Sequence, residues 1–311
     1  MKVAFVFPGQ GSQAVGMLDA WADNSVVTSI LKQADEALNQ NLSQIIQEGP
    51  AETLNLTSNT QPAMLTASYA IYQAWLAAGG RQPDSVAGHS LGEYTALAAA
   101  KALEFDDAVR LVRIRADAMQ TAVPVGMGGM AAILGLSDDE VLQACKKAAQ
   151  GGGVVEAVNF NAPAQVVIAG HQAAVERACE VAKEMGARRA VSLPVSAPFH
   201  SSLLKSAADV LALALNQLEV APPEIPLINN VDVLSPTEPQ AIKDALVRQS
   251  WHAVRWVETI QEMKERGVTH VVECGPGRVL TGLVKRIDRD LAALSINDPD
   301  SLQAALDALQ G

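Results

Sequence analysis

The sequence of 311 residues predicts an α/β fold, with a parallel sheet flanked by helices and interrupted by a smaller inserted subdomain. The first observation is an apolar run from Val3 to Phe7 that stops at Pro8-Gly9, as expected for a buried strand of a parallel sheet. The second is the alternation of such runs with segments of helical periodicity. The third is a change of pattern near Pro124, after which strands and helices follow in the order of a ferredoxin-like unit.

Strands and helices alternate in the first third of the chain. From Pro62 to Ala78 apolar residues recur every three or four positions, which indicates a helix with a buried face. The short apolar segment from Ser85 to Ala87 indicates a second buried strand. In chain order the expected elements are a strand at 3–7, helices at 26–38 and 62–78, a strand at 85–87 and a helix at 91–102.

The middle of the chain predicts the inserted subdomain. Ser137 precedes three acidic residues, which is a typical helix start, and Gly151-Gly152-Gly153 ends that helix. The expected elements are a strand at 130–136, a helix at 138–150, strands at 154–159 and 165–169, a helix at 173–185 and a strand at 189–195. This β-α-β-β-α-β order is that of a ferredoxin-like unit. We therefore assign residues 124–196 to the insertion, and residues 1–123 and 197–311 to the core.

After the insertion the α/β pattern resumes. A helix is expected at 203–218, followed by an apolar run at 225–228. A late strand is expected from Val268 to Glu273, and Gly275-Pro276-Gly277 turns it into a further helix.

Charge and cysteine content exclude several classes of function. Lys and Arg number 23 against 34 Asp and Glu, so the formal net charge is −11, which argues against a nucleic-acid groove and against binding to an anionic membrane. The three scattered cysteines form no C-x-x-C pair, which predicts no zinc site and fits the reducing cytoplasm. The apolar run at the N-terminus is too short for a signal peptide, and no run has the length of a membrane span. We expect neither a metal nor a cofactor.

The strongest local motif is Gly88-His89-Ser90-Leu91-Gly92, a G-x-S-x-G between the short strand and the Ala-rich helix. This context is that of a nucleophilic serine on a sharp strand-to-helix turn. The helix N-terminus offers a free N–H at Leu91, and its dipole favours negative charge that develops there. A chance occurrence of the pattern is the alternative, which the flanking strand and helix make several-fold rarer.

A nucleophilic serine needs a base, and the chain has five histidines. His200 lies on the loop where the α/β pattern resumes, from which it can reach a serine at the end of the sheet. Taken by itself, a hydrogen-bonded loop histidine is an equally good interpretation of His200. His89 and His270 are expected to pack, because the side chain of His89 should point away from that of its neighbour Ser90.

Arg115 lies on the apolar face of the helix expected at 106–121. Placed at 100° per residue, it falls in the centre of an apolar stripe. The stripe consists of Ala108, Leu111, Val112, Ala118 and Met119. An unpaired buried guanidinium costs several kcal/mol, so Arg115 should meet an anion or several acceptors. Two interpretations stay open, a structural ion pair with a buried carboxylate and a clamp for a substrate carboxylate such as that of a malonyl group.

Together these motifs resemble the malonyl-CoA:acyl-carrier-protein transacylase family over essentially the whole chain. The motifs that carry the resemblance are Phe7-Pro8-Gly9-Gln10-Gly11, Asn59-Thr60-Gln61-Pro62, Gly88 to Glu93, Val112-Arg113-Ile114-Arg115, Gly126 to Ala132, Asn159, Asn161, Pro198-Phe199-His200-Ser201, Gln249 and Gly275-Pro276-Gly277.

The resemblance implies an α/β-hydrolase-like core with a ferredoxin-like insertion, as the order of elements also predicts. It implies Ser90 as nucleophile, His200 as base and Arg115 as the clamp for the malonyl carboxylate. Phe199 resembles the malonyl-selecting form of its motif, because its ring leaves no room for a branched α-carbon. The further roles implied are an oxyanion hole at the N–H groups of Gln10 and Leu91, a carbonyl near Gln249 that orients His200, and substrate contacts at Phe199, Gln61 and Asn159.

The resemblance also implies malonyl-CoA and an acyl carrier protein as partners, in a dissociated fatty-acid synthase. We expect a monomer, since nothing in the sequence demands a dimer. Carrier proteins are usually acidic, so docking needs a local basic patch. The candidates are Arg188-Arg189 on the insertion and Lys285-Arg286 with Arg289 near the C-terminus, for which ordinary solvated charge is an equally good interpretation.

Alternative functions remain at this point. One is a stand-alone acyltransferase of a polyketide pathway or of a malonate-degrading complex. Another is a serine thioesterase, in which we would expect an acidic residue that orients the histidine and no buried arginine at position 115. A third is a non-catalytic scaffold, against which Ser90, His200 and Arg115 speak together.

Overall fold

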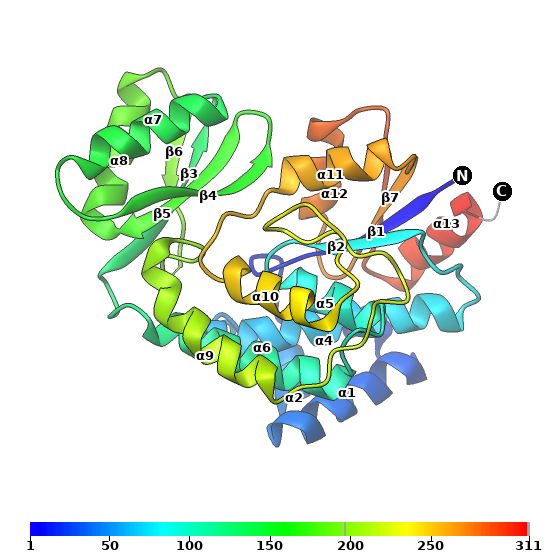
Figure 1. The fold of residues 1–311 in the computed structure, drawn as a ribbon. Helices are drawn as coiled ribbons and strands as arrows, with labels where there is room; N and C mark the ends of the chain where they lie inside the picture. Colours follow the sequence, from blue (N-terminus) through cyan, green and yellow to red (C-terminus); the bar gives the residue numbers. More distant parts are fainter. Residues whose placement is uncertain (196, 310–311) are drawn as a thin grey trace.

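The computed structural model describes residues 1–195 and 197–309. Its core contains a sheet of four parallel strands in the order β2-β1-β7-β8 (Figure 1). These strands are β1 (Val3–Phe7), β2 (Ser85–Gly88), β7 (His270–Cys274) and β8 (Ala292–Ile296). The predicted α/β fold class with a parallel sheet is therefore confirmed.

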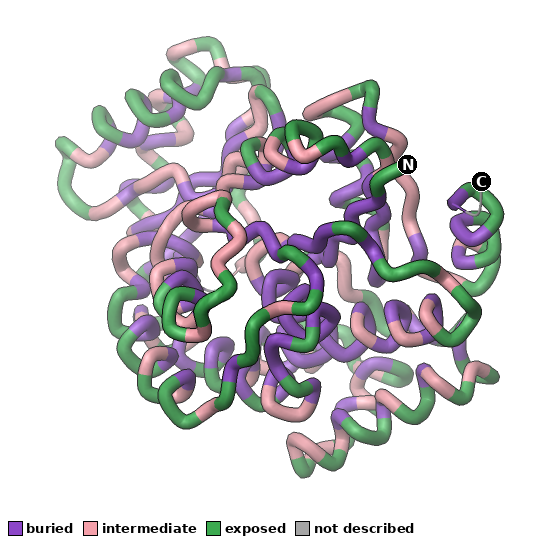
Figure 2. Tube along the Cα trace, turned by 45° about the vertical axis from the view of Figure 1, so that its right-hand side comes forward, coloured by how far each residue is buried: buried purple, intermediate pink, exposed green. Residues whose placement is uncertain are grey.

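Helices surround this sheet, and Figure 2 shows buried residues through the middle of the core while the outer helices alternate between buried and exposed positions. The helices are α1 (Ser25–Leu38), α2 (Leu42–Glu48), α3 (Ala51–Leu54), α4 (Thr57–Ala77), α5 (Gly92–Ala99), α6 (Phe105–Thr121), α9 (Lys205–Asn216), α10 (Pro239–Gln249), α11 (Trp256–Glu265), α12 (Val279–Ile287) and α13 (Pro299–Leu309), with 3-10 turns η1 (Asp19–Trp21) and η2 (Ser202–Leu204). The sequence pattern did not indicate helices α2, α3, α10, α11 and α13 or strand β8.

Aromatic rings hold α4 against the sheet. The ring of Phe5 on β1 lies 5.9 Å from that of Tyr72 and 5.4 Å from that of Trp75, and Phe7 lies 5.9 Å from Tyr72. Such pairs contribute roughly 0.5–1.5 kcal/mol each beyond the area that they bury. This packing fixes α4, and with it Gln61, relative to the end of β1.

Helix α4 begins at Thr57, five residues before the predicted start at Pro62. A proline inside a helix leaves the carbonyl four residues earlier without its donor. Here that carbonyl belongs to Ser58, and Arg113 Nε on α6 donates to it at 2.7 Å. A tertiary hydrogen bond therefore compensates for the proline, which the sequence pattern of α4 alone does not indicate.

The second sheet is antiparallel, in the order β4-β5-β3-β6, with α7 and α8 packed together beside it (Figure 1). Its elements are β3 (Gly128–Leu134), α7 (Asp138–Ala149), β4 (Val155–Ala162), β5 (Gln165–His171), α8 (Gln172–Glu184) and β6 (Arg189–Ser192). This order is that of a ferredoxin-like fold, as predicted. Ser137 caps α7 in a capping box with Glu140. Strand β6 ends three residues before the predicted Val195, and Ser196, the last residue of the predicted insertion, lies outside the described residues.

Two sets of hydrogen bonds tie β4 of the second sheet to the core. Val254, just before α11, donates to Val158 O at 2.8 Å and accepts from Phe160 N at 3.0 Å, so it runs alongside β4. Glu156 on β4 accepts hydrogen bonds from both the N–H (2.7 Å) and the hydroxyl (2.8 Å) of Ser202. The loop that carries His200 is thus held from the side of the insertion.

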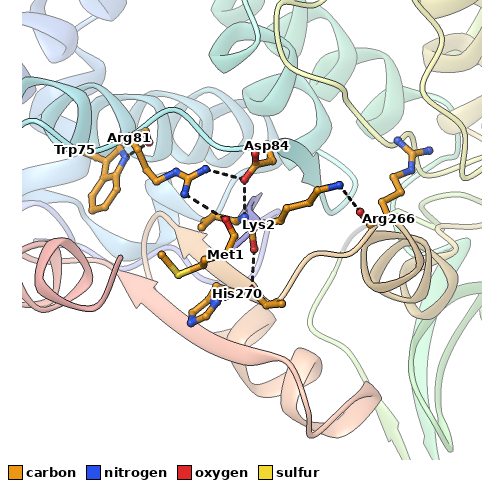
Figure 3. A network of polar contacts seen from close by, with 9 residues as sticks. Met1, Lys2, Trp75, Arg81, Asp84, Arg266 and His270 are labelled. Atoms are coloured by element: carbon orange, nitrogen blue, oxygen red, sulfur yellow. Dashed lines mark hydrogen bonds and ion pairs between the residues drawn. The ribbon is translucent and has the colours of Figure 1, made fainter. Parts of the chain in front are cut away.

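Polar contacts close the amino edge of the parallel sheet (Figure 3). Asp84, just before β2, accepts from the N–H of Val3 at 2.7 Å and pairs with Arg81 at 3.0 Å. The Lys2 Nζ donates to the carbonyl of Arg266 at 2.8 Å. The carboxyl edge of the sheet, where open α/β sheets bind ligands, therefore lies at the opposite ends of these strands. None of the helices in residues 1–195 and 197–309 combines the length and apolar character needed to cross a bilayer.

Candidate active site

Ser90 lies on a sharp turn between β2 and α5, at the carboxyl edge of the sheet. Its φ is +53°, in the left-handed region that residues other than glycine seldom adopt. A Cβ on Gly88 would lie 1.8 Å from the carbonyl carbon of Gly92, and a Cβ on Gly92 would lie 2.1 Å from the carbonyl oxygen of Phe7. The two glycines are therefore a steric requirement of the turn that presents the Ser90 hydroxyl.

The imidazole of His200 links Ser90 to a main-chain carbonyl. The Oγ of Ser90 lies 2.6 Å from His200 Nε2, and His200 Nδ1 lies 2.8 Å from the carbonyl oxygen of Gln249. A carbonyl only accepts hydrogen bonds, so Nδ1 carries the proton and the Nε2 lone pair faces the serine hydroxyl. Within residues 1–195 and 197–309 no carboxylate hydrogen-bonds His200, so the carbonyl stands where a serine triad has its acid.

The surroundings of His200 favour the neutral imidazole. Its side chain is 4% exposed. Burial lowers its pKa to about 3, and the positive charge of Arg115 acts in the same direction. A neutral imidazole is the form that can take the proton of a serine hydroxyl.

Arg115 is buried on α6 and points at the serine. Its Nη1 donates to Gln61 Oε1 at 2.7 Å, and its Nη2 donates to Gln249 Oε1 at 3.1 Å and to Ser90 Oγ at 3.2 Å. Among the described residues its Nε has no hydrogen-bond partner and no carboxylate lies within ion-pair distance. The structural ion pair left open by the sequence is thus not found, and burial lowers the pKa of Arg115. The guanidinium is surrounded by neutral acceptors and offers its charge to an anion beside Ser90.

A pocket of about 260 Å³ opens beside Ser90 between the core and the insertion. The insertion contributes Met130, Asn159 and Val167, from β3, β4 and β5, to its wall. Phe199 lies between the two halves, since its ring packs against the cluster around Met119 and against the cluster around Met130. The predicted site residues that line the pocket are Gln10, Gln61, Ser90, Leu91, Arg115, Asn159, Phe199 and His200. Gln249 does not line the pocket, but it hydrogen-bonds two residues that do, Arg115 and His200.

Gln10 and Leu91 bring two main-chain donors to this pocket. Gln10 follows β1, and its side chain turns toward Thr57, to which Nε2 donates at 3.3 Å. Leu91 is the residue before α5. In the part of the chain that the structure describes, neither main-chain N–H donates a hydrogen bond to a protein group. Both groups are therefore available to a ligand oxygen at the carboxyl edge of the sheet.

Comparison with known proteins decides the family. Residues 4–295 match the family model of the acyl transferase domain. Over 307 residues the chain is 52% identical to the malonyl CoA-acyl carrier protein transacylase of Escherichia coli (strain K12), which covers 98% of this chain and 99% of that protein. The chain belongs to the malonyl CoA-acyl carrier protein transacylase family.

Solved structures of transacylases have the same fold. The acyl-carrier-protein S-malonyltransferase from Burkholderia pseudomallei 1710b is 63% identical and superposes with a TM-score of 0.97, covering 99% of this chain and 100% of that chain. A malonyl-transacylase in complex with its type II PKS acyl-carrier protein is 48% identical, with a TM-score of 0.97, and covers 99% of this chain and 100% of that chain. The α/β-hydrolase-like core with its ferredoxin-like insertion is therefore the architecture of this transacylase family.

Two residues that support the turn of Ser90, Asn230 and Glu93, were not predicted from the sequence as site residues. Asn230 accepts from the N–H of Ser90 through Oδ1 at 2.8 Å and donates to the carbonyl of Gly88 through Nδ2 at 2.7 Å. Glu93 accepts from the N–H of Asn230 at 2.8 Å. A signal for Asn230 exists, since it follows the apolar run whose Leu227 pairs with Val86 of β2, so it lies at the carboxyl end of a strand-like segment.

Among the described residues, the side chains of the two other histidines considered from the sequence form no hydrogen bond with Ser90. His89 Nε2 lies 2.7 Å from Asn161 Oδ1, and its ring lies 5.3 Å from that of Trp256. Burial lowers the pKa of His89. His270 begins β7 at the opposite edge of the sheet, where its Nδ1 lies 2.8 Å from Thr269 Oγ1.

Proposed function

We propose that this chain transfers a malonyl group from coenzyme A to the phosphopantetheine thiol of an acyl carrier protein, through a malonyl ester of Ser90, for fatty-acid synthesis. The observation that carries the proposal is the buried guanidinium of Arg115, whose hydrogen-bond partners among the described residues are neutral and whose Nη2 lies 3.2 Å from Ser90 Oγ. A thioester carbonyl attacked by Ser90 then has its distal carboxylate, two carbons away, within reach of that guanidinium.

The first half of the reaction acylates the enzyme. His200 Nε2 takes the proton of the Ser90 hydroxyl as Oγ attacks the thioester carbonyl. The negative charge on the carbonyl oxygen is stabilised by the N–H groups of Gln10 and Leu91, and one donor of this kind is typically worth about 3 kcal/mol. The bond to sulfur then breaks, coenzyme A leaves, and its thiol receives the proton from His200.

The second half reverses these steps with a different thiol. The phosphopantetheine thiol of the carrier gives its proton to His200 as its sulfur attacks the malonyl ester. Ser90 leaves and recovers the proton from His200, so the enzyme returns to its starting state. This order predicts ping-pong kinetics, because coenzyme A departs before the carrier reacts.

The pocket selects a malonyl group through charge and shape. Arg115 binds the carboxylate, while Gln61 and Asn159 provide polar groups on opposite walls. The Phe199 ring between the two halves of the pocket limits substituents on the α-carbon.

The carrier surface is proposed to lie on α12. Lys285 and Arg286 are exposed on this helix, two and three residues after Leu283, which lines the pocket, and Arg286 also donates to Gln165 on β5. Arg188 and Arg189 lie at the start of β6. The residues of this segment that line the pocket, Leu193 and Val195, follow the end of the strand. An acidic carrier on α12 therefore has the shorter path for its pantetheine arm.

The carrier can belong to another pathway. One transacylase of known structure is in complex with its type II PKS acyl-carrier protein, and its chain is 48% identical to this one. A stand-alone acyltransferase for polyketide synthesis is therefore the second candidate, with the same chemistry at Ser90.

We also propose the following organisation. The inserted subdomain is 124–196, within a core of 1–123 and 197–311, since β3 to β6 pair in one sheet and lie between Gly128 and Ser192. Residues of one chain are enough to line the pocket, so the proposed reaction needs no second copy, and we propose a monomer. The free thiols of Cys145, Cys179 and Cys274 support a cytoplasmic location, and the net charge of −11 speaks against a nucleic-acid partner.

The test is the intact mass of the purified protein within seconds of mixing with malonyl-CoA, followed by peptide mapping. One malonyl group on Ser90, lost when carrier protein is added, is the expected result. Steady release of coenzyme A without an adduct would instead indicate a thioesterase. No adduct and no coenzyme A release would contradict both enzymatic functions.

A further inference from the structure

A buried carboxylate lies beneath the active site without lining it. Glu93 is in the first turn of α5, three residues after Ser90, and is 2% exposed. Its Oε2 accepts from the N–H of Asn230 at 2.8 Å and from the side-chain Nε2 of Gln249 at 3.2 Å. An ionised carboxylate is costly in such surroundings unless hydrogen bonds offset its loss of water.

The contact with Gln249 decides which way its side-chain amide is turned. The Nε2 of Gln249 faces three acceptors, which are Ser90 O at 2.9 Å, Glu93 Oε2 at 3.2 Å and Asn230 Oδ1 at 3.3 Å. The Oε1 of the same amide accepts from Arg115 Nη2 at 3.1 Å. Turning the amide by half a rotation would set its NH₂ group against the N–H groups of Arg115 and its oxygen against three other oxygens.

Asn230 donates the other hydrogen bond of Glu93, through its main-chain N–H, and its side chain holds the nucleophile turn. Its side-chain amide bonds on both sides of His89, to the Gly88 carbonyl and to the Ser90 N–H. Glu93 therefore contacts the side-chain amide of Gln249, which presents an acceptor to Arg115, and the main chain of Asn230, whose side chain fixes the main chain of Ser90. Of the acceptors that face Gln249 Nε2, Glu93 is the only carboxyl group among the described residues, and its hydrogen bond is charge-assisted when Glu93 is ionised.

We propose that Glu93 is a positioning residue for the acyl carboxylate, which acts by holding the Gln249 amide with its oxygen toward Arg115. The inference rests on malonyl transfer as the function of the site. Arg115 is held in line with Ser90 by Gln61 on one side and Gln249 on the other. If the Gln249 amide is free to turn, one of these two acceptors becomes a donor, and the guanidinium moves away from the place where the carboxylate binds.

The test compares Glu93→Gln with Glu93→Met. A glutamine at this position still presents one oxygen to Asn230 and Gln249, so Glu93→Gln should keep kcat/KM for malonyl-CoA within about threefold of wild type. Glu93→Met has no acceptor, and kcat/KM for malonyl-CoA should fall about tenfold or more, with a clearly smaller fall for acetyl-CoA. Glu273→Met serves as the matched control, because Glu273 is also fully buried and accepts main-chain N–H groups, from Leu280 and Thr281, away from Arg115.

A purely structural role for Glu93 predicts a different pattern. Glu93→Met would then lower the melting temperature as Glu273→Met does, reduce malonyl and acetyl transfer equally, and leave the ratio between the two substrates unchanged. That result, or a Glu93→Gln variant as impaired as Glu93→Met, would overturn the proposal.

Binding separates this proposal from the proposed function. Ser90→Ala cannot be acylated, so calorimetry with malonyl-CoA and acetyl-CoA measures binding alone. Adding Glu93→Met to Ser90→Ala should weaken malonyl-CoA binding about tenfold and leave acetyl-CoA binding unchanged. Equal weakening of both ligands contradicts the positioning role even if wild type forms the malonyl adduct. A wild-type protein without that adduct contradicts the proposed function itself and, with it, this inference.

Discussion

Gln249 contacts His200 through its main chain, with the carbonyl oxygen 2.8 Å from Nδ1, and contacts Arg115 through its side chain, with Oε1 3.1 Å from Nη2. One residue at the end of α10 thus serves both the base and the guanidinium. Because the two contacts come from different parts of the residue, substitution can separate them. The carbonyl remains whatever side chain stands at this position.

Replacing the side chain of Gln249 should therefore affect selectivity more than the base. In Gln249→Leu the carbonyl still holds His200, so acetyl transfer should fall less than about tenfold. Malonyl transfer should fall further, because Arg115 loses one of its acceptors, a loss typically worth about 1–3 kcal/mol. Steady-state kinetics with the two substrates checks this, and an equal loss for both would contradict the division of roles.

Arg115→Ala should abolish the preference for malonyl-CoA. Loss of a charge-assisted, two-point contact with a carboxylate is expected to lower kcat/KM for malonyl-CoA by about a thousandfold, while acetyl-CoA, which lacks the carboxylate, is much less affected. Arg113→Ala on the same helix is the matched control, because Arg113 binds Ser58 O and Gln40 outside the pocket. Arg113→Ala should lower stability and leave the ratio of kcat/KM for malonyl-CoA to that for acetyl-CoA unchanged. If Arg115→Ala lowers kcat/KM equally for both substrates, Arg115 is not the clamp for the carboxylate.

The rate of Ser90 acylation should depend little on pH across the range in which a free histidine titrates. Because the pKa of His200 is lowered to about 3, mainly by burial, the imidazole stays neutral from pH 8 down to about pH 5. The measurement is kcat/KM for malonyl-CoA as a function of pH, together with nitrogen NMR of the imidazole rings, in which the signal missing from His200→Ala identifies His200. A fall in rate centred near pH 6.5 would contradict this.

The free energy of unfolding should decrease as the pH rises toward the pKa of Glu93 in the folded protein. Burial raises the pKa of Glu93 from its ordinary value to about 7 in the folded protein. A raised folded-state pKa contributes stability below the unfolded value, and this contribution is lost as the pH rises through about 7. Glu93→Gln cannot ionise, so it should gain stability relative to wild type between pH 5 and pH 8, on the order of 1–3 kcal/mol. Urea unfolding of both proteins at the two pH values checks this, and parallel curves would contradict it.

Charge reversal on α12 should affect the carrier alone. Lys285→Glu combined with Arg286→Glu is expected to raise KM for acyl carrier protein about tenfold and to leave KM for malonyl-CoA unchanged, because steering of an acidic partner depends on local charge. Arg188→Glu combined with Arg189→Glu reverses the same number of charges at the start of β6 and should have little effect. The opposite ranking would place the carrier surface on the insertion.

Features that depend on near neighbours could be predicted from the sequence. The turn at Ser90 needs Gly88 and Gly92 within two residues on either side, so its spacing is visible in the chain. Arg115 stands out because a helix repeats every 3.6 residues, and a charge in an apolar stripe breaks that pattern. The capping box at Ser137 and Glu140 and the order of strands in the insertion are local in the same way.

The contacts that complete the site come from tertiary packing. Asn230 lies 140 residues from Ser90 in the chain, and Gln249 lies 134 residues from Arg115. Neutral amides and one buried carboxylate follow no periodic pattern, so nothing in the sequence shows that these side chains converge. The start of α4 before Pro62 has the same explanation, since its compensating donor is Arg113 on another helix. The fold class, the serine turn and a buried arginine that requires an anion or several acceptors can all be predicted from neighbouring residues in the chain. The polar groups that hold Ser90, His200 and Arg115 in place cannot, because a hydrogen bond between distant residues forms only once the packing of their helices and strands has set the distance between them.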